Sequence, residues 1–292
     1  MDWNNRHITA ILQNALAEDK ALDDATTAAC VDPGRKAVAT FLAKQDMTIA
    51  GLGLIERTVK IFAEMDGRVK TIPDVAMNKQ MFDGVKVAQG NQVAVLRHDA
   101  RVILSCERVM LNFLQRLSGI ATETRRYVDA IAGTRARILD TRKTVPGLRV
   151  LDKYAVTCGG GFNHRLDLSD GMLVKDNHIA AAGGIAAALE LAHRNRRGTQ
   201  PVEIEVRSLA EFEEALAAGA EAALLDNMPP EQCARAVERL KSHNRRVPLE
   251  ASGGITLANV RAFAEAGVDF ISVGALTHSV QAVDLSLRVQ AL

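Results

Sequence analysis

The second part of the chain alternates between short β-like runs and helical patterns, and this alternation constrains the fold more than any other feature. From Arg135 onward the β-like runs are "RARILD", "GMLVKD", "VEIEV", "AALLDN", "VPLEAS" and "DFISVGA". Helical patterns such as "IAAALELAHRN" and "PEQCARAVERLKSH" lie between most of them. Strands that alternate with helices form right-handed βαβ units and a parallel sheet. Six β-like runs in a row favour a (β/α) barrel over an open sheet.

The part of the chain before residue 115 mixes the two patterns. Residues 8–19 and 53–65 have helical spacing, whereas residues 83–104 alternate apolar and polar side chains between glycines, which is typical of two short strands. "SCERVMLNFLQRLSGIATETRRYVDAI" then predicts one long helix or two abutting helices. The last residues, "VQAVDLSLRVQAL", predict a closing helix.

The composition narrows the class of protein. The chain has 292 residues, of which 48% are hydrophobic and 24% charged, and its net charge is +1. A near-neutral chain with only 4% aromatic residues lacks the cations and the stacking platforms of a broad nucleic-acid surface, so we expect no nucleic-acid partner. The four cysteines lie far apart, which favours reduced thiols in a cytoplasmic protein over disulfides or structural zinc.

No segment of the sequence predicts export or membrane insertion. The N-terminus, "MDWNNRHITA", has an early Asp and no apolar run, unlike a secretory signal. The most apolar stretch, residues 179–192, is mostly Ala and Gly and is too short and too weakly apolar to span a bilayer. The seven histidines form no H-E-x-x-H pattern, so we expect no catalytic zinc.

Every candidate strand delivers polar groups at its carboxyl end, which is where chemistry collects in a (β/α) barrel. In chain order these groups are Asp140, Arg142 and Lys143; Lys175, Asp176, Asn177 and His178; Glu205 and Arg207; Asp226 and Asn227; Glu250, Ser252, Gly253 and Gly254; and Ser272 and Gly274.

Each of these features also has a plain structural explanation. Arg142 and Lys143 could form a surface ion pair with Asp140, and Lys175 could be a barrel lysine whose amine reaches solvent. The carboxylates could simply be charge partners of these cations, and the glycines could form tight turns.

The order of the groups is more informative than any one of them, because cations come first, carboxylates follow and Gly-rich turns come last. Gly-rich turns that open helices favour anions, and at the last strands of a barrel they commonly hold phosphate. The middle carboxylates suit Mg²⁺ or sugar hydroxyls. The early cations then face a second anionic ligand, and the planar fork of Arg matches a carboxylate.

A Gly-rich segment, "TCGGGFNHRLDLSDG", lies between the first two predicted strands. Gly159–Gly161 would let the backbone approach a ligand closely, and His164 and Arg165 add donors suited to carboxylate oxygens. A flexible loop and a structural histidine are the alternatives.

With these residues in place, the chain resembles the quinolinate phosphoribosyltransferase family. The resemblance runs from near residue 10 to the C-terminus, and its stretches come in the family's order with similar spacing. The most specific are those with T-R-K-T and N-H-R. The stretches are "ERVMLNFLQRLSGIAT", "DTRKTVPGLRVLDKYAV", "GGGFNHRLDLSDGMLVKDNHI", "EIEV", "LLDN" and "EASGGI".

The resemblance implies an α/β fold with two domains: an N-terminal α/β sandwich over residues 1–117 and an incomplete (β/α) barrel of six or seven strands over residues 118–276. A C-terminal helix, residues 277–292, would pack back on the first domain. It also implies a homodimer with shared active sites, in which each barrel mouth is covered by the partner's N-terminal domain.

The resemblance further implies the reaction. Quinolinate and phosphoribosyl pyrophosphate would give nicotinate mononucleotide, pyrophosphate and CO₂ with Mg²⁺ as cofactor, a step of NAD biosynthesis. We expect neither a covalent enzyme intermediate nor an organic cofactor. The alternatives are a related phosphoribosyltransferase acting on another pyridine acid, a Schiff-base lyase with Lys175 or Lys143 as the amine, and a binder of phosphorylated ligands without turnover.

The site residues carried over by the resemblance fall into three groups. The quinolinate carboxylates would be bound by Arg142, His164, Arg165 and Lys175, with Arg108 reaching in from the partner subunit. The catalytic residues facing the ribose, the pyrophosphate and Mg²⁺ would be Lys143, Glu205 and Asp226, with Glu205 and Asp226 as the metal residues. The 5′-phosphate end would be held by Ser252, Gly253, Gly254, Ser272 and Gly274.

Overall fold

The computed structural model describes residues 1–67, 73–77, 79–243 and 246–292. Contacts divide the chain into two units. Unit 1 comprises Met1–Arg125, Thr144–Gly160 and Ser279–Leu292, and unit 2 comprises Arg126–Lys143 and Gly161–His278. In this division residues 144–160 group with unit 1, whereas the sequence prediction assigned them to the barrel.

Unit 1 contains an antiparallel sheet. Its four strands are β1 (Lys36–Ala43), β3 (Asp74–Ala76), β5 (Gln92–Asp99) and β12 (Leu285–Ala291), in the order β12-β1-β5-β3. Burial alternates along β1, because every second side chain of the strand points to the buried face of the sheet. A separate pair is formed by β2 (Met47–Thr48) and β4 (Lys86–Val87).

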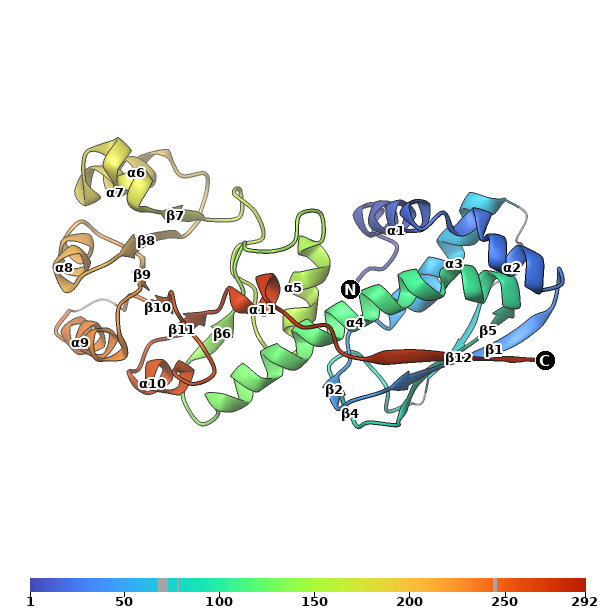
Figure 1. Ribbon diagram of the computed structural model, residues 1–292. Helices are drawn as coiled ribbons and strands as arrows, with labels where there is room; N and C mark the ends of the chain where they lie inside the picture. Colours follow the sequence, from blue (N-terminus) through green and yellow to red (C-terminus); the bar gives the residue numbers. More distant parts are fainter. Residues whose placement is uncertain (68–72, 78, 244–245) are drawn as a thin grey trace. The chain divides into compact units, whose positions relative to one another are not determined.

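Helices lie along one side of this sheet (Figure 1). They are α1 (Arg6–Glu18), the 3₁₀ helix η1 (Ala21–Asp23), α2 (Ala25–Cys30), α3 (Gly53–Asp66) and the first part of α4 (Ala100–Ala130). Helix α1 buries Ile8, Leu12 and Leu16, whose spacing of four residues places them on one helical face. The segment predicted as one or two helices is the single helix α4.

The prediction of a helix over residues 277–292 is wrong. Only Ala275–His278 (α11) is helical, and Leu285–Ala291 is strand β12, which pairs with β1 from Ala37↔Ala291 to Ala43↔Leu285. The stretch "LSLRVQA" alternates apolar and polar residues, which is the period of a strand, although Leu, Gln and Ala also favour helices. Strand β12 completes the sheet of unit 1.

Unit 2 contains the six parallel strands that the sequence predicts. They are β6 (Arg137–Leu139), β7 (Met172–Val174), β8 (Val202–Val206), β9 (Ala222–Asp226), β10 (Leu249–Ser252) and β11 (Phe270–Ser272), in the order β6-β11-β10-β9-β8-β7. Because β6 and β7 are the edges of this sheet, the barrel is incomplete. The fold class predicted from the sequence is confirmed.

The helices of the barrel follow their strands and cover the outer side of the sheet (Figure 1). Their bounds are α6 (Asp176–Ala182), α7 (Ile185–Asn195), α8 (Leu209–Ala217), α9 (Pro230–Lys241) and α10 (Val260–Glu265). The apolar stretch 179–192 is divided between α6 and α7 by Gly183 and Gly184. In the described part of the chain, no helix is both long and apolar enough to cross a membrane.

Helix α5 (Arg149–Cys158) belongs to unit 1 and is anchored there by a buried ion pair. The guanidinium of Arg116, on α4, donates from Nε and Nη2 to the two carboxylate oxygens of Asp152, at 3.0 and 2.8 Å. Asp152 is fully buried, so loss of this bidentate pair would leave an uncompensated charge in the core.

Close packing of helix α4 against the C-terminal segment makes a testable prediction. A Cβ on Gly119 would lie 2.3 Å from the carbonyl oxygen of Gln281. Gly119→Ala should therefore lower the free energy of unfolding by about 1–3 kcal/mol through overpacking, although Ala normally favours a helix. Urea unfolding followed by circular dichroism measures this change.

The matched control is Asn112→Ala at an exposed position of the same helix. It should leave stability unchanged or raise it by less than about 1 kcal/mol. A Gly119→Ala protein as stable as this control would contradict the packing of residues 281–282 against α4.

Candidate active site

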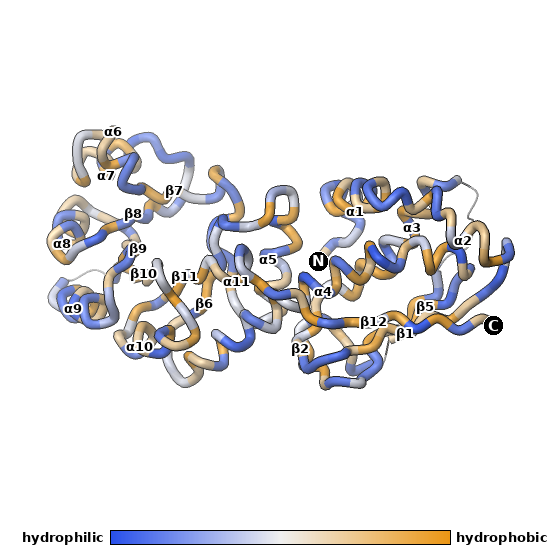
Figure 2. Tube along the Cα trace, in the orientation of Figure 1, coloured by the Kyte–Doolittle hydropathy of each residue, from blue (hydrophilic) through white to orange (hydrophobic). Residues whose placement is uncertain are grey.

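The register of the parallel strands brings polar side chains to common levels inside the barrel. Glu205 and Glu250 are both in register with Leu224 on the strand between them, and Ser252 is in register with both Asp226 and Ser272. Residues in register on neighbouring strands point to the same face of a sheet. Figure 2 shows hydrophilic segments where β7, β8 and β9 end. The polar groups of separate strands therefore face one space.

That space is a cavity of about 780 Å³ at the carboxyl ends of the strands, lined entirely by residues of unit 2. Apart from Arg108, all the site residues predicted from the sequence line it. These are Arg142, Lys143, His164, Arg165, Lys175, Glu205, Asp226, Ser252, Gly253, Gly254, Ser272 and Gly274. Arg108 is exposed on α4 in unit 1.

Three cationic residues from the first strands share this cavity. Burial and the neighbouring charge of Arg142 lower the pKa of Arg165, which is partly offset by Glu203. Among the described residues, the Nε of Arg142 is one of the few buried side-chain nitrogens without a hydrogen-bond partner. Lys175 completes the group. Two arginines close enough to repel each other, one with an unsatisfied donor, are an arrangement that an anion would stabilise.

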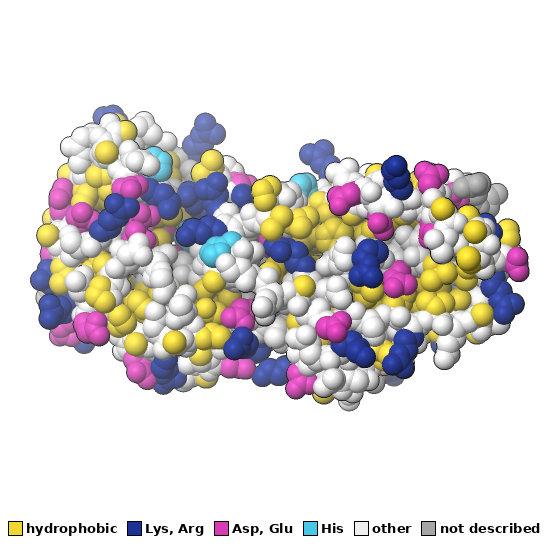
Figure 3. Space-filling view, in the orientation of Figure 1, with side chains coloured by type: hydrophobic (Ala, Val, Ile, Leu, Met, Phe, Trp, Pro, Cys, Tyr) yellow, Lys and Arg dark blue, Asp and Glu magenta, His cyan; other side chains and the backbone are white. Residues whose placement is uncertain are grey.

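The carboxylates of the middle strands meet cations at the same edge of the barrel. Lys175 Nζ lies 3.0 Å from Glu205 Oε2. The guanidinium of Arg207 lies 2.7 Å from Asp176, 3.7 Å from Glu205 and 3.6 Å from Asp226. Figure 3 shows Lys and Arg side chains gathered with Asp and Glu side chains over this part of the molecule.

The ion pairs at this edge of the barrel also shift the pKa values of its exposed residues Asp176 and Arg207. A hydrogen bond from the backbone N–H of Asn177, and then one from Arg207, lower the pKa of Asp176. The same pairing raises the pKa of Arg207. Arg207 and Asp176 are therefore held together by a charge-assisted hydrogen bond.

His164 lies beside two carboxyl groups, the partly exposed one of Glu203 and the buried one of Glu250. Its Nδ1 accepts a hydrogen bond from the backbone N–H of Arg165 at 2.7 Å, and its Nε2 lies 3.4 Å from Glu203 and 3.5 Å from Glu250. Because Nδ1 is an acceptor, the ring proton belongs on Nε2, between the two carboxyl groups. The Ser272 hydroxyl donates to Glu250.

Burial, and then the charge of Glu203, raise the pKa of Glu250 to about 8. Three nearby groups act in the opposite direction, namely His164, Ser272 and Lys175. This environment favours the protonated form of Glu250, which lies on the wall of the cavity.

The Gly-rich turns close the last side of the cavity. Gly253 has φ +93°, and a Cβ there would lie 2.2 Å from Oδ1 of Asn227, so this position requires glycine. Helix α10 begins only at Val260, so the Gly253–Gly254 turn does not open directly into a helix as the sequence predicts. Gly274 packs against Lys143 and His278, and the Thr277 hydroxyl donates to the Lys143 carbonyl oxygen at 2.8 Å.

Two residues of this region were given no role from the sequence. Glu203 precedes Glu205 by two residues on β8. The alternation in "VEIEV" is the signal that places both side chains on one face of the sheet. Arg207 was noted at a strand end without a role, and its position between two carboxylates depends on strand pairing that the sequence does not reveal.

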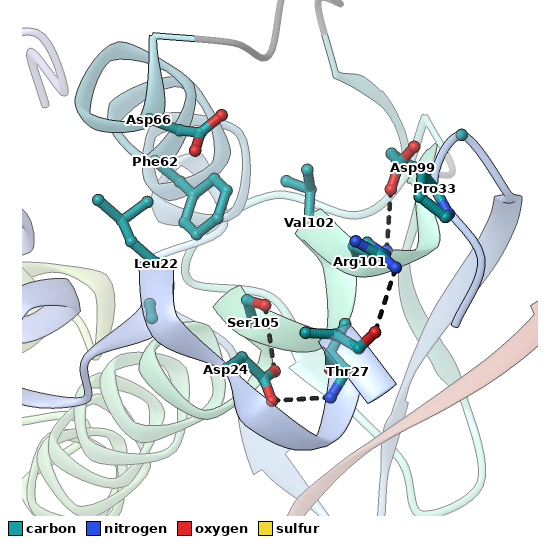
Figure 4. A pocket seen from close by; sticks show the side chains of 13 residues that line it. Leu22, Asp24, Thr27, Pro33, Phe62, Asp66, Asp99, Arg101, Val102 and Ser105 are labelled. Atoms are coloured by element: carbon teal, nitrogen blue, oxygen red, sulfur yellow. Dashed lines mark hydrogen bonds between the residues drawn. The ribbon is translucent and has the colours of Figure 1, made fainter. Parts of the chain in front are cut away.

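Unit 1 has a second cavity, of about 440 Å³, between η1, α2, α3 and the start of α4 (Figure 4). Its polar groups are occupied by local structure. Asp24 accepts hydrogen bonds from the backbone N–H of Thr27, as the N-cap of α2, and from the Ser105 hydroxyl. Arg101 donates to the carbonyl oxygens of Val31 and Ala28. The cavity of unit 2 is therefore the stronger candidate.

Two family models together match most of the chain. "Quinolinate phosphoribosyl transferase, N-terminal domain" matches residues 24–118, and "Quinolinate phosphoribosyl transferase, C-terminal domain" matches residues 120–288. The strands that form the cavity of unit 2 all lie within the second match.

Several named relatives are similar to this chain over nearly their whole length. A probable nicotinate-nucleotide pyrophosphorylase [carboxylating] of Bacillus subtilis is 40% identical over 98% of this chain and 94% of its own. The enzyme of that name from Mycobacterium leprae is 41% identical over 94% of this chain and 95% of its own. The crystal structure of NadC from Streptococcus pyogenes has a TM-score of 0.90 and 38% identity, covering 100% of this chain and 99% of that one.

Proposed function

Since this chain belongs to the quinolinate phosphoribosyltransferase family, we propose that it transfers phosphoribose from phosphoribosyl pyrophosphate to quinolinate. The products are nicotinate mononucleotide, pyrophosphate and CO₂. The observation that carries this proposal is the buried, unpartnered Nε of Arg142 beside Arg165 and Lys175 in one cavity. A dianionic acid would supply anionic acceptors to this group of cations.

The two quinolinate carboxylates are assigned to Arg142, Arg165 and Lys175. Bringing a dianion against a polyphosphate costs Coulomb energy, which is large in a cleft of low dielectric constant. Cations already held in the cavity offset that cost without having to be gathered during the reaction. His164 belongs to the same group, and direct contact with quinolinate requires its ring to turn away from Glu203 and Glu250.

The second substrate is assigned to the other side of the cavity. Lys143 would face the pyrophosphate, and Glu205 and Asp226 the ribose. The 5′-phosphate would lie against the turns that contain Ser252, Gly253, Gly254, Ser272 and Gly274. A glycine backbone lets phosphate oxygens approach N–H groups closely.

Mg²⁺ fits the donor groups of this site. Glu205 and Asp226 present oxygen ligands at one edge of the cavity, and Arg207 lies between them as a positive charge. Mg²⁺ prefers oxygen and usually binds through one or two carboxylates together with substrate phosphates. Held there, it would neutralise charge on the pyrophosphate leaving group.

The residues then act mainly by positioning. The cations that hold the carboxylates fix the pyridine ring so that its nitrogen faces C1 of the ribose. Glu205 and Asp226 face the positive charge that develops on the ribose as pyrophosphate departs, and Lys143 faces the departing charge. Once the nitrogen is ribosylated, the pyridinium withdraws electrons from C2, and the adjacent carboxylate leaves as CO₂.

The proposal includes a homodimer in the cytoplasm, in which Arg108 of one subunit completes the site of the other. Arg108 is exposed and therefore free to meet another chain. Its guanidinium would add another donor for the carboxylates of quinolinate.

Turnover with the two pyridine acids tests the function directly. The purified protein with Mg²⁺ and phosphoribosyl pyrophosphate should release CO₂ and form nicotinate mononucleotide from quinolinate, and should be essentially inactive on nicotinate. A coupled assay for nicotinate mononucleotide measures both. Turnover of nicotinate alone would favour a related transferase, binding without turnover a non-catalytic protein, and borohydride trapping of Lys175 or Lys143 a Schiff-base lyase.

Mixing two inactive variants tests the shared site. Arg108→Ala and Arg165→Ala place their defects on different subunits of the same site, so a heterodimer retains one site with both arginines. With random exchange, about half of the dimers are mixed, and each has one intact site of two, so activity should recover to about a quarter of wild type. Mass-verified heterodimers without activity would contradict sharing, and two Arg108→Ala preparations mixed together are the control.

A further inference from the structure

A buried acid lies in a site that must bind an acid. Glu250 is 3% exposed, lines the cavity, and lies 3.5 Å from His164 Nε2, while Glu203 lies 3.4 Å from the same nitrogen. One ring nitrogen of His164 and one carboxylate oxygen each of Glu203 and Glu250 all lie within 4.8 Å of one another. Two carboxylates next to the cations that receive quinolinate, one of them buried, would repel it unless one of them carries a proton.

The surroundings of Glu250 favour that proton. Burial first, and then the charge of Glu203 on β8, raise its pKa to about 8. The groups that face it from the other elements are His164 before β7, Lys175 after β7 and Ser272 on β11, and they offset only part of this rise. The neutral form of Glu250 removes one negative charge from the floor of the cavity and leaves an acidic O–H there.

The proposed reaction has a step that needs such a proton. When the C2 carboxylate leaves as CO₂, the electron pair of the broken C–C bond stays on C2 of the pyridinium. The product has hydrogen at C2, so a proton must arrive from outside the two substrates. Lys175 and the arginines are committed to carboxylate oxygens in the assignment above, and Glu205 and Asp226 face the ribose.

We propose that Glu250 is the general acid that protonates C2 of the ribosylated pyridine ring as CO₂ leaves. This role rests on the proposed function and assigns its last step to a named residue. The C2–carboxylate bond breaks, its electron pair takes the proton from the Glu250 carboxyl group, and a C–H bond forms. Glu250 becomes a carboxylate and regains a proton from water before the next turnover. Ser272, whose hydroxyl donates to the Glu250 carboxyl group, holds it in place as a positioning residue.

The assignment separates two events that occur in one active site. Pyrophosphate release reports ribosyl transfer, and CO₂ release from carboxyl-labelled quinolinate reports decarboxylation. Without the acid, the C2 electron pair recaptures CO₂, so the ribosylated and still carboxylated intermediate accumulates. Positioned general acids contribute about 10²–10⁴-fold to such steps.

The test is a single-turnover comparison of wild type with Glu250→Gln, which keeps the shape and hydrogen bonds of the side chain without its acidic proton. Pyrophosphate release by the variant should stay within about threefold of wild type, while CO₂ release slows by about 10²-fold or more. Equal slowing of both events, or slowing of neither, overturns the proposal. A wild-type protein that does not convert quinolinate instead refutes the proposed function.

Two further variants keep the test decisive. Glu250→Asp retains an acid and should recover part of the lost decarboxylation, whereas a variant that folds but recovers nothing contradicts proton donation. Glu203→Gln removes a negative charge that helps to raise the pKa of Glu250, so the fall in CO₂ release with rising pH should begin at lower pH than in wild type. An unchanged fall in Glu203→Gln would contradict the assignment of that pH dependence to Glu250. Thermal unfolding and quinolinate binding confirm that each variant is folded.

The pH dependence gives an independent measurement. A carboxyl group with a raised pKa is protonated below that value, so decarboxylation should be constant at lower pH and fall as pH rises through about 8. The slope should approach tenfold per pH unit, and Glu250→Gln should lack this limb. An unchanged limb in the variant would overturn the assignment.

Discussion

Mutual repulsion among cations within one cavity is the constraint on which the rest of this site depends. Burial, and then the charge of Arg142, lower the pKa of Arg165, and the Nε of Arg142 is buried without a hydrogen-bond partner. An arrangement of this kind costs folding free energy unless a ligand supplies anionic acceptors. The same cavity also holds carboxyl groups from the middle strands, so the charges are sorted by position. The cations can then bind two anionic substrates, while the carboxylates stabilise positive charge that develops on the ribose.

The parallel sheet produces this sorting. Its register sets Glu205 and Glu250 at one level and Asp226, Ser252 and Ser272 at the next, so neighbours in space come from distant parts of the chain. The turn at Gly253 and Asn227 fixes the rim, because a side chain at residue 253 would collide with Asn227. The fold therefore supplies both the location of the site and the rigid separation of its charged groups.

Much of this arrangement could be predicted from sequence because it depends on local pattern. The six strands of the barrel and the polar residues at their ends follow from alternation and strand polarity. Strand β12 was missed because its partner β1 is distant in the sequence, with Ala43 paired to Leu285, and because its residues also favour a helix. Arg207 between two carboxylates and Glu203 beside His164 could not be predicted, because cross-strand neighbours depend on register.

Equilibrium binding of quinolinate to Arg142→Ala measures the central claim most directly. Isothermal titration should give a dissociation constant for quinolinate raised by at least about tenfold, the value of one lost charge-assisted hydrogen bond. Binding of phosphoribosyl pyrophosphate should change by less than about threefold, and the exposed control Arg246→Ala should change neither. Equal loss for both substrates, or unchanged binding of quinolinate, would contradict an account in which these cations neutralise the acid.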